Sequence, residues 1–165
     1  MSRDEILRRA QRYAERYALV VREPLGFGVH GIVLVAECHH QAGRSAIKVH
    51  ERGTSYSRER DVYLRLRDRE VTDIRGCRVP RLMRYDDELW VIEMDVVDRP
   101  FVLDFAGAYL DSPPDYPEET LAEWRSEKQE QFGDRWPEVE RILWSLERYG
   151  VYLSDVTPGN VALGD

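Results

Sequence analysis

The sequence predicts an α+β fold: a five-stranded antiparallel sheet with one inserted helix, followed by a smaller helical part. Apolar residues recur at helical spacing in residues 3–19, and β-branched segments bounded by glycine and turn residues run from residue 20 to residue 94. After residue 98, helical patterns alternate with proline and glycine breakers. We treat the 165 residues as one domain. Its expected parts are an N-terminal helix at 1–19, a sheet-bearing part at 20–97 and a reduced helical part at 98–165.

The sheet-bearing part contains five strand patterns and one helix pattern. Strands are predicted at 20–25, 32–38, 45–50, 79–85 and 89–94. A glycine-containing loop at 26–31 joins the first two strands, and a helix at 55–69 follows the third. Asp86 and Asp87 form a turn between the last two strands, so these strands should pair as an antiparallel hairpin.

The helical part begins with a short helix expected at 101–110. A proline cluster at 112–117 separates it from a longer helix at 118–132. Pro137 suits the first turn of a further helix, and Gly150 is placed to end it. The tryptophans of these helices should either fill the core or form a surface for another protein. They are Trp124, Trp136 and Trp144.

Composition argues against two classes of partner. The net charge is −7, with 24 basic residues scattered among 31 acidic ones, whereas nucleic-acid binding favours a clustered basic surface. No apolar run reaches the roughly 18 residues that span a membrane, and the N-terminus has no apolar signal core. Cys38 and Cys77 are too few for a disulfide framework and are expected to be buried thiols. A cytoplasmic location follows as the expectation.

The glycine segment is the sharpest local pattern. Gly26, Gly28 and Gly31 fit G-x-G-x-x-G-x-V between two predicted strands. Glycines let the backbone approach a phosphate closely and present its amides as donors. A Rossmann site would need a helix directly after this loop, and here a strand follows. A plain hairpin turn is the alternative.

Lys48 lies in a strand pattern otherwise made of apolar residues. A buried lysine needs an anionic partner, because an unpaired buried charge is costly. Glu59 on the following helix is placed to pair with Lys48 if that helix covers the sheet. Two alternatives stay open: Lys48 lies on a solvent-facing or edge strand, or Glu59 is solvated on a helix crowded with charge.

Asp155 and Asn160 lie five residues apart across a Pro-Gly loop, between apolar segments at 151–153 and 161–163. A carboxylate placed in this way can orient a hydroxyl and accept its proton, and an amide oxygen can hold a magnesium ion. A surface β-turn is the alternative, because Pro-Gly-Asn is common in turns.

These patterns, in this order, resemble the protein-kinase-like superfamily over about residues 20–164. The glycine segment matches its glycine loop, Ser45-Ala46-Ile47-Lys48 is close to its V-A-I-K, and Asp155 to Asn160 fits its D-x-x-x-x-N catalytic loop. The Pro-Gly-Asn ending is more similar to that of aminoglycoside-type phosphotransferases. The fold implied is kinase-like and two-lobed, with the second lobe much reduced.

The resemblance implies a site for the cofactors ATP and Mg²⁺. Glu59 would orient Lys48 toward the phosphates, and Asp155 would act as the base. Asn160, with Asp155, would hold the metal. The residues implied to bind nucleotide are Gly26, Gly28, Gly31, Val33, Ala46, Lys48, Glu93, Met94 and Asp95, the last three through backbone groups beside adenine.

The chain departs from the family pattern after Asn160. The family keeps a second metal-binding aspartate in D-F-G, beyond the loop asparagine, and the sequence here ends at Asp165. That last carboxylate is expected to point away from the phosphates. Leu153 and Ser154 replace the His and Arg of the family's catalytic loop.

Several functions therefore stay open. The first is an ATP-binding, kinase-like phosphotransferase of minimal, atypical type, acting on an unknown small-molecule or protein acceptor. The second is a pseudokinase that senses nucleotide or serves as a scaffold. A homodimer or a partner protein could complete the helical part and supply the missing carboxylate. A third interpretation is an unrelated domain in which both glycine-containing loops are plain turns.

Overall fold

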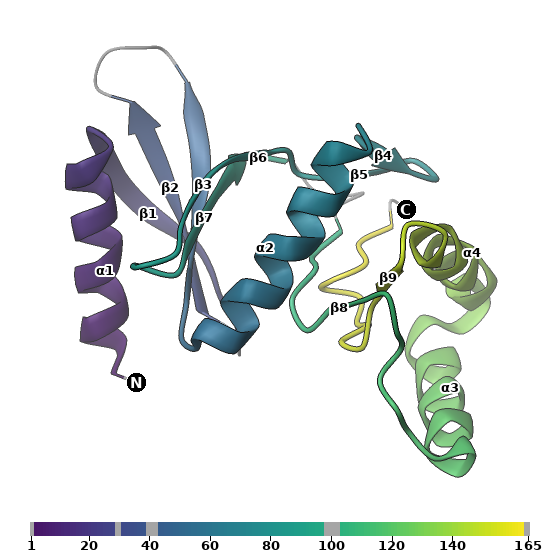
Figure 1. Cartoon of the computed structure of the whole chain (residues 1–165). Coiled ribbons are helices and arrows are strands. Elements are labelled where there is room, and N and C mark those ends of the chain that lie inside the picture. The colour runs from purple at the N-terminus through teal and green to yellow at the C-terminus, as the bar shows by residue number, and fades with distance from the viewer. Residues whose placement is uncertain (1, 29–30, 39–42, 98–102, 164–165) are drawn as a thin grey trace.

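The computed structural model describes residues 2–28, 31–38, 43–97 and 103–163. It shows an α+β fold around a five-stranded antiparallel sheet (Figure 1). The strands, in their order across the sheet, are β1 (Leu19–Gly28), β2 (Gly31–Cys38), β3 (Arg44–His50), β7 (Val91–Asp95) and β6 (Leu82–Asp86). The predicted five-stranded sheet is thus confirmed, with β3 at its centre.

Helix α1 (Arg3–Arg16) packs on one face of this sheet (Figure 1). Ser2 caps it, because the Ser2 hydroxyl accepts a hydrogen bond from the Glu5 amide at 3.3 Å. The apolar stripe of the helix meets every second residue of the strands, as the two-residue period of a strand requires. The cluster contains Ile6, Ala10, Tyr13, Ala14, Leu19, Ile32, Leu34, Ala36, Ile47, Val49, Leu89 and Val91.

Helix α2 (Gly53–Asp68) covers the opposite face of the sheet (Figure 1). It is the predicted inserted helix, and it begins two residues earlier than expected. The alternate residues of β3, which point away from α1, face this second core. Its buried members from the sheet and α2 include Ala46, Ile92, Met94, Tyr56, Val62, Tyr63 and Leu66. The two faces of one central strand therefore serve two different cores.

Residues 103–163, as the structure describes them, contain two α-helices and a short strand pair. Helices α3 (Glu118–Phe132) and α4 (Trp136–Glu147) confirm the expected pattern, with the 3₁₀ turn η1 (Gly133–Arg135) between them. Strand β8 (Tyr109–Leu110) pairs with β9 (Val151–Tyr152), which places the end of the helical part beside residues that precede it.

The helix expected at 101–110 is wrong for its described residues. Leu103 forms an isolated antiparallel bridge with Val161, and the Ala108 amide closes a turn on the Phe105 carbonyl at 3.0 Å. Gly107 inside this turn has a φ of 72°, a conformation outside the helical region. The segment is apolar nearly throughout, so its sequence shows no periodicity that separates a buried strand from a helix.

Two smaller expectations also need correction. A short hairpin, β4 (Asp73–Ile74) with β5 (Cys77–Arg78), lies between α2 and β6 and was not expected. Cys77 in this hairpin is buried as predicted, whereas Cys38 at the end of β2 is exposed. Cys38 is the last residue of β2, at the end of the strand, where its apolar neighbours in the sequence do not cover it.

Candidate active site

Lys48 lies in the central strand β3 on the face that α2 covers. Its side chain is 7% exposed, so the alternative of a solvent-facing or edge-strand lysine is wrong. Val33 is the cross-strand partner of Lys48 on β2, and Ile92 is its partner on β7. The ammonium group is therefore surrounded by apolar strands and needs its charge balanced nearby.

Glu59 provides one of the balancing charges. Its carboxylate Oε1 lies 2.8 Å from Lys48 Nζ, and its side chain is 1% exposed. The alternative of a solvated Glu59 is therefore wrong. His50, at the end of β3, places Nε2 2.9 Å from the second carboxylate oxygen of Glu59. The lysine and the glutamate form a buried pair between a central strand and a helix.

Asp104 provides the second charge, and it was not among the residues predicted from the sequence. Its Oδ1 lies 2.9 Å from Lys48 Nζ and also accepts the Ala106 amide at 3.0 Å. The Asp104 side chain is 37% exposed, so this carboxylate lies where the buried pair meets solvent. A signal was present, because Asp104-Phe105-Ala106 is close to D-F-G, although it precedes Asp155 in the chain.

The three charges stabilise one another. Burial lowers the pKa of Lys48, but the neighbouring Glu59 and Asp104 carboxylates outweigh burial, so the lysine pKa rises above its ordinary value. Burial raises the pKa of Glu59, but Lys48 and the hydrogen bond from His50 outweigh it, so this pKa falls to about 2. Lys48 is consequently a cation and Glu59 an anion at neutral pH.

The Asp155–Asn160 loop is tied to Asp104 through the backbone. The Asp104 amide donates to the Asn160 carbonyl at 2.9 Å, next to the Leu103–Val161 bridge. Within the loop, the Asn160 side-chain amide donates to the Asp155 carbonyl at 2.9 Å. Asp104, which the sequence interpretation did not include, thus contacts Lys48 through its carboxylate and the loop of Asp155 and Asn160 through its backbone amide.

The loop predicted at 26–31 is shorter in the structure, because β1 extends to Gly28 and β2 begins at Gly31. Gly26 and Gly28 belong to β1, where they pair with Val33 and Gly31 of β2, and the residues between them and β2 at 29–30 lie outside the described part. At Gly31 a Cβ atom would overlap the carbonyl of Val49 on β3. The close approach of two strands is therefore sufficient to require glycine at position 31.

Val33 and Ala46 lie on the same face of the sheet as Lys48. Ala46 is buried and Val33 is partly buried, and both contact the core that α2 covers. Cross-strand pairing places Val33 opposite Lys48, and Ala46 opposite Met94. Both side chains therefore lie in the core beside Lys48.

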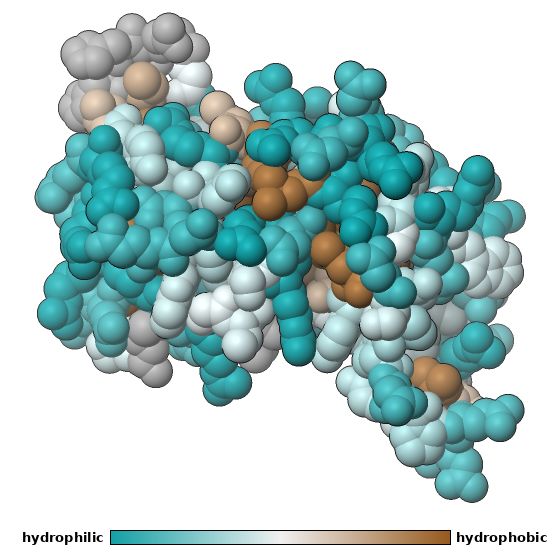
Figure 2. Space-filling view, viewed as in Figure 1, coloured by the Kyte–Doolittle hydropathy of each residue, from teal (hydrophilic) through white to brown (hydrophobic). Residues whose placement is uncertain are grey.

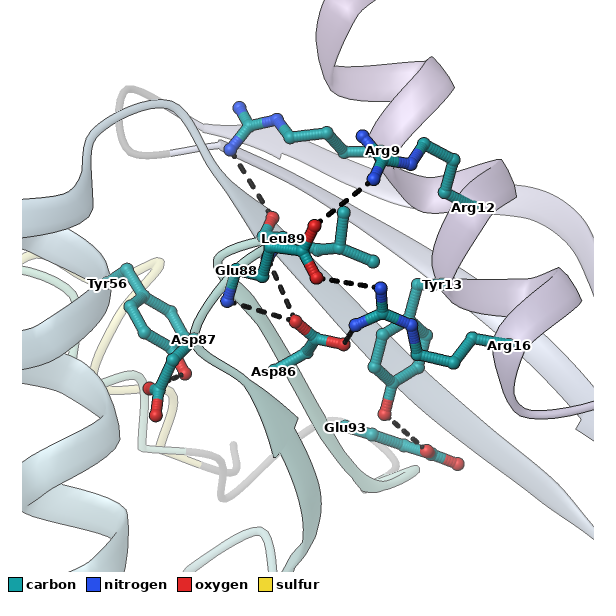
Figure 3. A network of polar contacts seen from close by, with 10 residues as sticks. All are labelled: Arg9, Arg12, Tyr13, Arg16, Tyr56, Asp86, Asp87, Glu88, Leu89 and Glu93. Atoms are coloured by element: carbon teal, nitrogen blue, oxygen red, sulfur yellow. Dashed lines mark hydrogen bonds and ion pairs between the residues drawn. The ribbon is translucent and has the colours of Figure 1, made fainter.

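The backbone groups of Glu93, Met94 and Asp95 in β7, predicted to contact a nucleotide, are used within the sheet. Glu93 and Met94 pair with both β3 and β6, and the Asp95 amide donates to the Arg81 carbonyl at 3.1 Å, so the backbone of this strand is engaged in the sheet. The Glu93 carboxylate points to the α1 face, where the Tyr13 hydroxyl donates to it at 2.8 Å (Figure 3). The backbone groups of Glu93 and Met94 are therefore used within the sheet.

The oxygen groups of this site suit a hard cation. Both contacts of the Asp104 carboxylate fall on Oδ1, and the described residues give Oδ2 no hydrogen bond. The Asn160 side chain uses its amide NH₂, so its oxygen remains as a potential ligand. Within the described part of the chain, no group of three or more His, Cys, Asp or Glu side chains could hold a metal ion.

A separate cavity of about 630 Å³ lies in the helical part. It is lined by α3, α4 and the segment before α3, and it includes Leu153 and Ser154, directly before Asp155. Trp136 beside it is buried, whereas Trp144 is 58% exposed, so the tryptophans divide between core and surface. Figure 2 shows a mostly hydrophilic face, with hydrophobic side chains only in small separate areas.

Neither a scan of protein-family models nor a search of curated proteins finds a match for this chain. In the residues that the structure describes, no helix combines the length and apolar character needed to cross a membrane.

Proposed function

We propose that the chain binds ATP and acts as a kinase-like phosphotransferase of minimal, atypical type. The observation that carries the proposal is the buried Lys48–Glu59 pair, joined through Asp104 to the loop of Asp155 and Asn160. Buried charged groups are costly to maintain, and a cluster of them beside a partly exposed carboxylate is typical of a functional site.

Lys48 is the proposed phosphate-binding residue. Its charge is kept by Glu59 and Asp104, and an ammonium held in a fixed place suits a phosphate oxygen as a point charge. Phosphoryl transfer depends mainly on positioning and on neutralising charge that develops on the phosphate. The role of Glu59 is to hold Lys48 rather than to react.

Asp104 supports the proposal because it supplies a carboxylate that the sequence interpretation found missing. In the family that the sequence resembles, D-F-G follows the loop asparagine after a β-hairpin. Here the similar segment precedes the loop, yet Leu103 still pairs with Val161, directly after Asn160. Phe105 is fully buried and packs edge-to-face on Tyr63 of α2, with 5.3 Å between the ring centroids. The position of Asp104 beside this loop supports the proposal, although its segment comes earlier in the chain than D-F-G does in the family.

Asp104 and Asn160 are the proposed ligands of Mg²⁺, beside Asp155. Magnesium commonly takes one or two protein oxygens, with waters and substrate phosphates completing its shell, so two ligands are sufficient. When bound, the ion would supply positive charge to the phosphate oxygens. Asp155 then serves as the group that orients the acceptor hydroxyl and accepts its proton.

Val33 and Ala46 bound the proposed nucleotide slot. The proposed backbone contact to adenine is revised from Glu93–Asp95 to Val96 and Val97, the last described residues after β7. The cavity that Leu153 and Ser154 line, directly before Asp155 in the chain, has the size of a small-molecule pocket, about 300–1,000 Å³ in general. This favours a small-molecule acceptor over a protein. No nucleic acid is involved in the proposal.

The deciding experiment is calorimetric ATP binding with and without magnesium, followed by a search for phosphoryl transfer to small alcohols. The chain contains two lysines, Lys48 and Lys128, and Lys128 on α3 provides a matched control. We expect Lys48→Met to weaken ATP binding at least tenfold and Lys128→Met to leave it unchanged. Equal effects of both substitutions, or no binding at millimolar ATP, would overturn the proposal.

A nucleotide-sensing pseudokinase is the second candidate. It is favoured by Ser154, which stands where the family has a catalytic-loop arginine and donates its hydroxyl to the Gly107 carbonyl at 2.6 Å. That side chain is therefore used to hold the loop to the Asp104 segment. Magnesium-dependent binding without transfer to any acceptor, together with an ATP half-life equal to that in buffer, would support this second function.

A further inference from the structure

We propose that His50 is a positioning residue for the Lys48–Glu59 pair, and that Arg9 of helix α1 holds His50 in turn. The inference rests on the proposed function of Lys48. It brings into the site a helix that lies before the part of the sequence that resembles a kinase.

The two oxygens of the Glu59 carboxylate have different donors. Oε1 accepts from Lys48 at 2.8 Å, and Oε2 accepts from His50 Nε2 at 2.9 Å. A carboxylate accepts hydrogen bonds only, so Nε2 of the fully buried His50 carries the hydrogen. With a donor on each oxygen, Glu59 cannot turn away from Lys48 without leaving a buried donor unpaired.

The imidazole ring is itself held on other sides. Its edge meets the ring of Tyr56 with centroids 5.6 Å apart. The backbone amide of His50 also donates to the Trp90 carbonyl at 3.0 Å. The ring therefore has one supported orientation, in which Nε2 faces Glu59.

Helix α1 reaches the same residue from the opposite face of the sheet. Arg9 Nη2 donates to the His50 carbonyl at 2.9 Å, and its Nη1 donates to the Leu89 carbonyl at 3.3 Å. The guanidinium also lies over the Trp90 ring, 4.9 Å from its centroid. Figure 3 shows Arg9 extending from α1 toward Leu89. The end of β3 is thereby held between α1 and the turn before β7.

The alternative is a histidine that only fills the core. Both roles predict that losing His50 lowers stability, so stability cannot separate them. Only the positioning role predicts that Lys48 becomes freer to react. The experiment measures acetylation of Lys48 by an N-hydroxysuccinimide ester of acetate, without nucleotide, with Lys128 as the internal reference in mass spectrometry.

The variants are His50→Leu, which removes the donor, and His50→Gln, whose amide keeps one. Arg9→Met tests the link to α1, and Arg12→Met is its control, because Arg12 lies on the same helix and forms an exposed ion pair with Glu88. Val62→Ala, a buried change on α2, controls for lost stability. All reactions run well below each variant's melting temperature.

We expect His50→Leu to raise Lys48 acetylation about tenfold relative to Lys128, the size of effect produced by losing one hydrogen bond to a charged group. His50→Gln should restore most of the protection, and Arg9→Met should raise acetylation about threefold. If His50→Leu does not fold, the acetylation of Lys48 is compared between His50→Gln and Arg9→Met. Lower acetylation in His50→Gln than in Arg9→Met then supports the proposal. Acetylation unchanged by His50→Leu, or matched by Val62→Ala, would overturn the proposal.

The same variants are then titrated with magnesium and ATP. His50→Leu should weaken binding about tenfold, while the control Arg12→Met leaves it unchanged. A wild type that fails to bind ATP but shows the acetylation pattern would refute the nucleotide function and support the positioning role. Normal ATP binding by His50→Leu would refute the positioning role alone.

Discussion

Replacing Glu59 with glutamine removes one negative charge from the buried cluster while keeping the shape of the side chain. Lys48 keeps Asp104 as a partner, at 2.9 Å, but Asp104 is 37% exposed and cannot balance a buried ammonium as well as Glu59 does. Breaking a buried ion pair by removing one partner costs about 3–5 kcal/mol. Because one partner remains, we expect the lower end, about 3 kcal/mol of unfolding free energy.

The assay is urea denaturation at pH 7, with unfolding monitored by tryptophan fluorescence and far-ultraviolet circular dichroism. The expected loss corresponds to a fall in melting temperature of roughly 6–12 °C for a chain of this length. Glu88→Gln is the control, because the Glu88 side chain is 64% exposed and its ion pairs are at the surface. That substitution should cost less than about 1 kcal/mol.

The stability difference between wild type and Glu59→Gln should also depend on pH. The pKa of Glu59 falls from 4.5 to about 2 on folding. A lowered carboxyl pKa stabilises the folded state above the unfolded pKa, and this contribution disappears as the pH falls through the folded value. The difference between wild type and Glu59→Gln should therefore narrow between about pH 4.5 and pH 2. A cost below about 0.5 kcal/mol at pH 7, or a cost independent of pH, would refute the reasoning.

Three further predictions test other parts of the structure. In calorimetry, the factor by which magnesium strengthens ATP binding should be at least tenfold smaller for Asp104→Asn than for wild type. An equal factor in the two proteins would exclude Asp104 as a ligand. Tyr13→Phe should lower unfolding free energy by about 1–3 kcal/mol in urea, because the buried Glu93 loses a donor; no loss would show that α1 is not held there. Ellman's reagent at pH 8 should modify Cys38 rapidly and Cys77 only in denaturant, since burial raises the pKa of Cys77 to about 11; equal rates would contradict the burial.

Local patterns were sufficient for the sheet and for the first pair of the site. The strand and helix periods predicted β3 and α2, and a lysine among apolar strand residues required an anion such as Glu59. The pairing distance of 2.8 Å confirms that expectation. These features depend on residues close together in the chain, where spacing and side-chain chemistry constrain the answer.

Asp104 could not be placed in the same way. Its position depends on the pairing of Leu103 with Val161, a contact between distant segments that no periodicity in the sequence specifies. A helix was also expected at 101–110, so the similarity of residues 104–106 to D-F-G was not considered. The side of the sheet that Glu93 faces depends on strand register, in which one residue of shift exchanges the two faces.

The bridge between Leu103 and Val161 has a consequence for the order in which the molecule is assembled. Helix α1, the sheet and α2 all precede residue 97, so their contacts can form while the rest of the chain is still being synthesised. Lys48 and Glu59 can therefore meet early, through contacts close in sequence. The Leu103–Val161 bridge can form only after Val161 has emerged from the ribosome, so Asp104 and Asn160, the proposed metal ligands, come together after Lys48 and Glu59.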